Sequence, residues 1–545
     1  MKRRTPSFRT ASLSRDARSF ATVGFMACST LIAPAWAAGQ NTSALRTAPE
    51  RTEFRETTRY DDVVAFMRAA DAASDLIHLT TFGQTSEGRD LPLAVVGRVA
   101  GPTPEAVRAA GRTVLYLQGN IHAGEVEGKE SLLMLLRAVT QGQLDALLDS
   151  LVLLVAPIYN ADGNERVSPT NRGAQNGPVN GMGQRPNAQG YDLNRDHMKL
   201  DSPEARAVAA LFTRYDPHVG VDLHTTNGTR HAYHLTYAPP LNPATDSAII
   251  GLLRGRWLPA ITANVRRRYG WEFYYYGNLQ GQGDARGWWT FDHRPRFNNN
   301  YVGLRNRFAI LSEAYAYATF QDRITATSWF VQEILAFAHA NATEIRRITE
   351  QVDRASLVGT RLALRADFER APRPVEILMG EVAEEVNPVT GQRMLRRLDV
   401  RRPELMPEYG TFRPTETERV PRAYLVPAAL SSALEKLAQH GVRSAPSSSP
   451  MSLPIERFRI DSTTVAREFQ GHQERTLFGA WEAVTETLPA GTVIVPVDQP
   501  LGRLLFYLLE PRSDDGLVNW NVVDAALEGA RAYPILRTHA PLPAR

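Results

Sequence analysis

Residues 113–125, Thr-Val-Leu-Tyr-Leu-Gln-Gly-Asn-Ile-His-Ala-Gly-Glu, place an apolar run directly before a short turn that presents His122 and Glu125. The apolar run is typical of a buried β-strand, and residues 127–139 after the turn are expected to form a helix. Because the turn is short, the imidazole and the carboxylate can converge on one ion while the helix fixes their backbone. The same pair also fits an ordinary helix start, where carboxylates are common. Taken alone, it is half of a metal site.

Two further apolar runs end at polar residues of the same kinds. Residues 219–223, Val-Gly-Val-Asp-Leu, stop at His224, and residues 308–311, Phe-Ala-Ile-Leu, stop at Ser312 and Glu313. Zinc in a catalytic site takes three protein ligands from His and carboxylate side chains and leaves one position open for water. We therefore expect one zinc ion per chain, held by His122, Glu125 and His224.

Glu313 is then the candidate general base. A carboxylate beside metal-activated water takes a proton from it and passes that proton to the leaving amine. The alternative is an ordinary acid at the surface end of a strand. Residues 308–311 predict a buried strand, however, and a buried carboxylate needs a partner, which such a water supplies.

Helical and strand patterns alternate along the first part of the chain. Several expected strands are apolar throughout, as strands covered on both faces are. This alternation, with polar residues at strand ends, predicts an α/β fold: a mixed, largely parallel sheet sandwiched by helices, with the site beyond the carboxyl ends of the strands. The expected helices are 61–70, 127–139 and 329–339, and the expected strands are 91–96, 114–117, 151–158, 219–223 and 308–311.

The order of these residues resembles the zinc carboxypeptidases of the carboxypeptidase A/B type. The His-x-x-Glu pair is followed by Asn194-Arg195 within Gly-Tyr-Asp-Leu-Asn-Arg-Asp, by Ser-Pro-Glu at 202–204, and then by a lone His and a Glu at strand ends. Gly83–Arg89 is similar to an early turn of that family, and Tyr159–Gly163 is similar to its Asn-Pro-Asp-Gly turn with Ala in place of Pro. The resemblance covers roughly residues 55–345 and implies the fold predicted above, in a secreted bacterial member of the family.

The resemblance assigns substrate binding to Asn194 and Arg195. Arg195 would hold the free C-terminal carboxylate of a peptide as a bidentate fork, and Asn194 would add a hydrogen bond. The alternative is a turn in which Arg195 pairs with Asp192 or Asp196.

Two further assignments rest on the resemblance alone. Arg172 is the best match to the arginine that stabilises the oxyanion of the scissile carbonyl, with Arg166 and Arg185 as rivals. Arg172 and Arg185 lie in residues 171–190, which are rich in Gly, Asn, Gln and Pro and too long for a simple connection, so we expect a functional loop bordering the site. Tyr301 is taken as the substrate-capping tyrosine, although a packing role fits it as well. The other tyrosines of the region are Tyr274, Tyr275 and Tyr276.

The N-terminus has the pattern of an export signal. Basic residues precede an apolar stretch from 20 to 36, which closes on Ala35-Trp36-Ala37. This pattern is typical of a bacterial signal peptide cleaved after Ala37. The alternative, an uncleaved membrane anchor, is disfavoured because Pro34 and small residues shorten the apolar run. We expect a periplasmic or extracellular protein with no stable membrane insertion after cleavage.

Charge and cysteine content follow from the same segment. Residues 1–37 carry six basic side chains and one acidic one, so their removal changes the formal net charge from +4 to −1. The basic character is therefore a feature of export, and no nucleic-acid partner is expected. The only cysteine, Cys28, also lies there, so the exported protein should hold no disulfide.

A chain of 545 residues exceeds the size at which one core keeps growing, so two domains are expected. We place the catalytic domain at residues 50–345 and an accessory domain of unknown role at 350–545. The second range contains no pair like His122 and Glu125, and we expect it to supply neither a zinc ligand nor a general base. Its apolar runs at 493–497 and 504–509 are interpreted as strands.

The sequence thus predicts a secreted zinc metallopeptidase, most simply a carboxypeptidase acting on peptides with a free C-terminal carboxylate. Two other enzymes of the same chemistry stay open, a deacylase of N-acyl amino acids and a hydrolase of peptidoglycan stem peptides. A binding protein that has lost turnover is a different class. The presence of Glu313 argues against it, because a degenerate member is expected to lose that residue or a ligand first.

Overall fold

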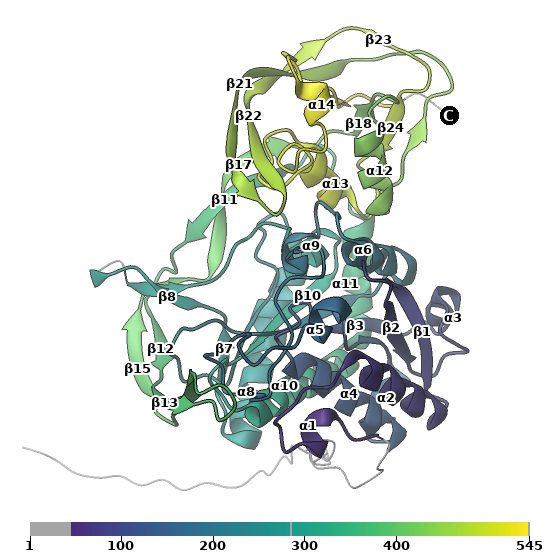
Figure 1. The fold of residues 1–545 in the computed structure, drawn as a ribbon. Helices are drawn as coiled ribbons and strands as arrows, with labels where there is room; N and C mark the ends of the chain where they lie inside the picture. The colour runs from purple at the N-terminus through teal and green to yellow at the C-terminus, as the bar shows by residue number, and fades with distance from the viewer. Residues whose placement is uncertain (1–44, 284–285, 543–545) are drawn as a thin grey trace, which may run out of the picture.

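The computed structural model describes residues 45–283 and 286–542 (Figure 1). The expected signal peptide, residues 1–37, lies outside these residues. The first part of the chain forms a body built around one large sheet, and the strands from residue 361 onward lie above it and along one side of it.

An eight-stranded mixed sheet forms the centre of that body, in the order β1-β2-β4-β3-β5-β10-β6-β7. Its middle strands β4, β3, β5 and β10 are parallel to one another. Antiparallel pairs lie on both sides of them, at β1-β2, β2-β4 and β10-β6. The strands are β1 Ile77–Gln84, β2 Asp90–Val96, β3 Thr113–Gly119, β4 Leu151–Ala156, β5 Val219–Thr225, β6 Leu235–Ala238, β7 Phe273–Tyr275 and β10 Phe308–Ala314. This confirms the predicted mixed, largely parallel sheet.

Helices cover both faces of the sheet, as the alternation of side chains along β5 makes clear. A side chain at Gly220 would meet Phe212 of α6 and Val302 of α9, whereas the side chain of Leu223, on the other face, lies against Gly128 of α4. No helix within the described ranges is both long and apolar enough to cross a membrane. The helices of this part are α1 Ala48–Arg51, α2 Tyr60–Ala72, α3 Pro104–Ala109, α4 Glu127–Thr140, α5 Ala161–Glu165, α6 Pro203–Tyr215, α7 Ser247–Leu252, α8 Leu258–Tyr269, α9 Asn298–Leu304, α10 Phe320–Ala340 and α11 Ala342–Arg354.

The C-terminal region is mainly antiparallel β-structure. Its largest sheet has six strands in the order β19-β24-β18-β25-β21-β22, and β21 and β22 form a long hairpin. Its strands are β11 Arg361–Glu369, β12 Val375–Met379, β13 Val382–Val386, β14 Arg393–Arg397, β15 Arg402–Met406, β16 Glu408–Tyr409, β17 Thr411–Arg419, β18 Ala423–Val426, β19 Ala445–Pro446, β20 Met451–Ser452, β21 Ile455–Phe469, β22 His472–Val484, β23 Thr487–Leu488, β24 Val493–Pro496 and β25 Leu536–Thr538. Its helices are α12 Ser431–Gln439, α13 Gly502–Leu509 and α14 Asp524–Leu527.

The C-terminal region is not separate from the body. β16 pairs in parallel with β9 (Gly287–Trp289), which in turn pairs with β8 (Asn278–Gln280). The buried apolar side chains of α13 also belong to the same cluster as those of the eight-stranded sheet. The two parts therefore share one buried apolar cluster.

One strand prediction was wrong. Residues 504–509 lie in α13, where every residue from Gly502 to Leu509 is buried. An apolar run that is buried on all sides has no periodicity, so a short helix and a short central strand have the same pattern. The neighbouring run is β24, Val493–Pro496, as expected for a strand.

The close packing of α4 on β5 gives a stability test. A Cβ at Gly128 would lie 2.7 Å from the Cβ of Leu223, which directly precedes His224. Gly128→Ala should lower the free energy of unfolding by about 1–3 kcal/mol, because overpacking outweighs the gain in helix propensity. Urea unfolding measures the change. The matched control is Gly251→Ala in α7, where a Cβ meets nothing within 4 Å. It should be neutral or stabilising, and equal effects of both variants would contradict the packing argument.

Candidate metal centre

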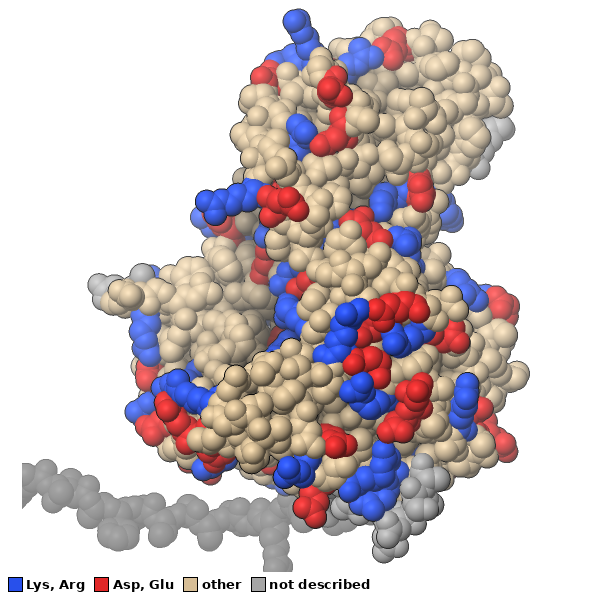
Figure 2. Space-filling model, viewed as in Figure 1, with Lys and Arg blue, Asp and Glu red and all other residues tan. Residues whose placement is uncertain are grey.

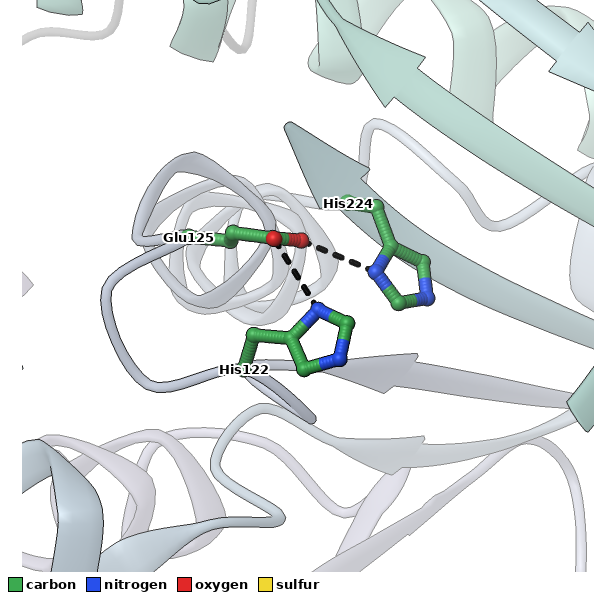
Figure 3. A group of neighbouring side chains, drawn as sticks. All are labelled: His122, Glu125 and His224. Carbon is green, nitrogen blue, oxygen red and sulfur yellow. Dashed lines mark hydrogen bonds and ion pairs between the residues drawn. The ribbon is translucent and has the colours of Figure 1, made fainter. Parts of the chain in front are cut away.

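The register of neighbouring parallel strands brings the three predicted ligands together. Gly119 at the end of β3 lies opposite Leu223 of β5, so the turn after β3 stands beside His224. Candidate ligand atoms of His122, Glu125 and His224 all lie within 4.8 Å of one another, and all three residues are buried (Figure 3). Two imidazoles and one carboxylate are a donor set that suits zinc.

Hydrogen bonds fix which imidazole atoms face the centre. Nδ1 of His122 lies 2.9 Å from one oxygen of Glu125, and Nδ1 of His224 lies 2.8 Å from the other (Figure 3). Each Nε2 faces a second carboxylate instead: that of His122 is 2.9 Å from Asp192, and that of His224 is 2.7 Å from Asp222. Each Nε2 faces an aspartate and each Nδ1 faces the centre, so a metal ion would replace the proton that each Nδ1 shares with Glu125. This arrangement fits metal ligation.

Asp192 and Asp222 complete the centre, and no sequence motif assigns either of them to it. From the sequence alone, Asp192 is a candidate partner of Arg195 only. For Asp222 there was a usable signal, because it stands two residues before His224 in a strand and therefore on the same face. Nothing local in the sequence indicates that Asp192 reaches His122, 70 residues away.

Strong opposite charges hold this buried group together. Burial would raise the pKa of Glu125, but Arg172 and His122 hold it well below its usual value. Burial would lower the pKa of His224, but Asp222 and Glu125 raise it well above its usual value. Carboxylates thus stabilise positive charge at the centre, which a bound cation also supplies.

Glu313 lies beside the cluster, as the sequence predicted for a residue at the end of β10. It is opposite His224 in the parallel pairing of β10 and β5, and it lines the same cavity of about 310 Å³ as the three cluster residues. Burial raises the pKa of Glu313 to about 8, with Glu125 acting in the same direction and His224 against it. A carboxylate with a raised pKa is a proton acceptor poised near neutral pH.

Asn194 and Arg195 line the same cavity. Arg195 forms no ion pair with any acidic residue in the described part of the chain, because its acidic neighbours are otherwise engaged: Asp192 with His122 and Arg185, and Asp196 with Lys199. Its guanidinium stacks over the ring of Phe297 at 3.9 Å. The alternative pairing of Arg195 with Asp192 or Asp196 is therefore not formed; its Nη1 donates to the backbone oxygen of Asn194 at 2.7 Å, and the cationic group lines the pocket.

The loop 171–190 supplies two arginines to the site. Arg172 contacts a carboxylate oxygen of Glu125, and Arg185 lines the cavity and donates to Asp192 at 2.8 Å. Arg166 instead pairs with Glu87 away from the cluster, at 2.5 Å. The structure thus leaves Arg172 and Arg185 as the two candidates for oxyanion stabilisation.

The assignment of Tyr301 to the substrate is corrected by the structure. Its side chain is buried in α9, and its hydroxyl lies 2.9 Å from His440 and accepts from Arg305 at 3.0 Å. The tyrosine that lines the cavity is Tyr276, whose hydroxyl accepts from Asn278 at 3.0 Å. The spacing in this long segment did not distinguish the two.

A second cavity, of about 560 Å³, adjoins the first. The two share Gln280, Thr290 and Phe291, and the far wall of the second comes from the C-terminal region, including Phe368 and Phe412. Figure 2 shows the drawn face hollowed between the arm that carries β8 and the rest of the molecule. The C-terminal region therefore borders the space next to the metal centre.

Comparisons with known proteins find carboxypeptidases. Residues 63–248 match the family described as zinc carboxypeptidase. Carboxypeptidase 2 of Trichophyton tonsurans is 24% identical over 508 residues, which cover 88% of this chain and 86% of that protein. Carboxypeptidase D of Rattus norvegicus is 33% identical over 144 residues, 23% of this chain and 10% of that protein. The crystal structure of carboxypeptidase A from Helicoverpa armigera aligns with 16% identity and a TM-score of 0.41, covering 57% of this chain and 79% of that one.

Residues 63–248 are similar to the zinc carboxypeptidase family and include His122, Glu125 and His224, and the chain is an enzyme that hydrolyses peptide bonds. Because the two named relatives come from a fungus and a rat, they give no support to a bacterial source. The share of this chain aligned with the fungal protein is too large to be confined to residues 1–349. The similarity therefore extends into the C-terminal region, beyond the range recognised from motifs.

The carboxylates behind the imidazoles give a test of the centre. His122→Ala or His224→Ala should abolish stoichiometric zinc binding, because each removes a ligand. Asp222→Asn should weaken zinc binding by about 10–100-fold, because it removes the acceptor that orients His224. Competition with a zinc chelator measures both. Asp145→Asn, at an exposed position, is the control and should bind zinc as the wild type does. Full zinc occupancy in either alanine variant would remove that histidine from the site.

Proposed function

We propose that the enzyme is a metallocarboxypeptidase that binds one zinc ion per chain and removes C-terminal residues from peptides with a free C-terminal carboxylate. One observation carries the proposal. Arg195 lines the cavity of the metal cluster, and within the described residues no carboxylate pairs with it. A half-buried guanidinium that donates to the backbone oxygen of Asn194 at 2.7 Å but pairs with no carboxylate of the described residues favours an anion as ligand. The name of the fungal relative, carboxypeptidase 2, supports the same choice.

Different side chains of the site would carry out the separate steps of peptide hydrolysis. Zinc, when held by His122, Glu125 and His224, supplies Lewis-acid activation of the peptide carbonyl and of water. The carboxylate of Glu313 takes the proton of the attacking water and delivers it to the nitrogen of the leaving amine. Arg172 or Arg185 stabilises the oxygen on which negative charge develops.

Asn194 and Arg195 would fix the end of the peptide. The side-chain oxygen of Asn194 already accepts from the backbone N–H of Asn298 at 2.8 Å, which leaves its amide nitrogen to donate to the substrate. The guanidinium of Arg195 lies over the ring of Phe297 and donates from Nη1 to the backbone oxygen of Asn194, so it is oriented before a carboxylate arrives. Such preorganisation reduces the entropy lost on binding.

Export to the periplasm or the extracellular space is part of the proposal. It is supported by the basic, apolar and small-residue segments of residues 1–37. N-terminal sequencing of the exported protein tests it, with Ala38 expected as the first residue.

Glu313→Gln separates the base from the ligands. The amide cannot take a proton, so kcat should fall by about 10²–10⁴-fold, while zinc content and the urea midpoint stay close to those of the wild type. Steady-state kinetics on a blocked dipeptide measures the loss. The control is Glu344→Gln in α11, far from the cavity and paired with Arg256 at the surface. Turnover within threefold of the wild type in Glu313→Gln would exclude Glu313 as the base.

If Arg195 binds the C-terminal carboxylate of the peptide, efficient hydrolysis requires a substrate in which that carboxylate is free. Amidating the substrate's C-terminus should lower kcat/KM by about 10–100-fold, because a charged hydrogen-bond partner is lost. Arg195→Lys should lose much of this discrimination, since an ammonium cannot form the bidentate fork. Arg214→Lys, at an exposed position in α6, should keep it. Equal rates on acid and amide substrates would favour a deacylase or an endopeptidase on the same site.

A further inference from the structure

The tip of the β21–β22 hairpin reaches the metal centre from the C-terminal region. Between the two strands, Gln470 and Gly471 form the turn, and both have positive φ, 53° and 80°. The side-chain oxygen of Gln470 accepts from the backbone N–H of Asp192 at 2.8 Å. A side chain at Gly471 would lie 3.7 Å from the ring of Tyr191. The hairpin tip therefore lies against the segment that begins at Tyr191.

Asp192 links the hairpin tip to the metal centre, because it contacts both Gln470 and His122. One of its carboxylate oxygens accepts from His122 Nε2 at 2.9 Å and from the backbone N–H of Asn194 at 3.0 Å, and the other accepts from Arg185 at 2.8 Å. The same short segment carries Arg195. A shift of Asp192 therefore moves a metal ligand and the substrate-binding pair together.

We infer that Gln470 is a positioning residue of the active site: by holding the N–H of Asp192, the C-terminal hairpin fixes the orientation of both His122 and the Asn194-Arg195 pair. The inference rests on the proposed function for Arg195, but its part concerning His122 depends only on zinc binding. It gives the C-terminal region, 278 residues away in sequence from Asp192, a role in the site without making it a source of ligands.

Other contacts dock the hairpin independently of Gln470. His472 lies 2.6 Å from Asp201, and Glu474 accepts from Arg296 at 2.6 Å. Arg296 is in turn bound to Asp515 of the C-terminal region. Because these ion pairs keep the tip in place, replacing Gln470 removes one acceptor and leaves the docking intact. A local substitution can thus test the contact without detaching the hairpin.

The test uses two substitutions of Gln470 that both remove the acceptor but differ in their effect on the backbone of the turn. Gln470→Met keeps the length of the side chain but removes the acceptor. Gln470→Gly removes the acceptor and also relieves the left-handed backbone, so it should not lower the urea midpoint. The matched control is Arg467→Met, an exposed residue of the same hairpin. All are compared in the full chain for zinc affinity by chelator competition, for kcat and KM on an acid substrate, and for urea unfolding.

Both Gln470 variants should bind zinc about 10-fold more weakly, at the low end of the loss seen for groups that orient a ligand. They should also raise KM for the acid substrate by about 10-fold with less change in kcat, because ground-state binding is lost. Arg467→Met should match the wild type in all three measurements. Zinc affinity and KM within twofold of the wild type in both variants would overturn the inference. If the wild type hydrolyses no peptide acid while both variants still lose zinc affinity, the proposed function fails and the positioning of His122 by Gln470 stands.

Discussion

The parallel register of β3, β5 and β10 is the constraint on which the site depends. Parallel neighbours end at the same edge of a sheet, so the residues that follow or close these strands meet there whatever their separation in sequence. His224 and Glu313 are opposite each other in that register, and the turn carrying His122 and Glu125 stands beside them. The helices on both faces hold the strands in this register, with α4 packed so closely that only glycine fits at position 128.

Charge balance is the second requirement. Each imidazole of the cluster lies between two carboxylates, Glu125 on the inner side and Asp192 or Asp222 on the outer side. Such a group is costly to bury unless cations offset it. Arg172 and Arg185 supply part of that charge, and a metal ion suits the rest. Arg195 forms no ion pair with the described residues of this network, which is why the proposed function assigns it to the substrate.

The C-terminal region is closely joined to the catalytic body, as its buried apolar runs indicate. It shares a hydrophobic cluster with the sheet, pairs β16 with β9, forms one wall of the second cavity and contacts Asp192 through Gln470. The alignment with the fungal relative also extends into it. The C-terminal region thus contributes none of the three candidate metal ligands, but it contributes to the structure around the site.

The sequence by itself determined the features that are local. An apolar run followed by a polar residue marks a strand end, so the central strands of the sheet, the residues of the cluster and Glu313 followed from short patterns and their order, whereas β1, β6 and β7 did not. It did not determine features that depend on distant contacts. Leu504–Leu509 is a helix because it is buried on all sides, and Tyr301 packs on His440 because α9 faces the C-terminal region. Asp192 reaches His122, and Gln470 reaches Asp192, only in the folded chain. Hydrogen bonds between segments 70 and 278 residues apart leave no periodic or local signal, because their geometry exists only once the strands and the hairpin have packed.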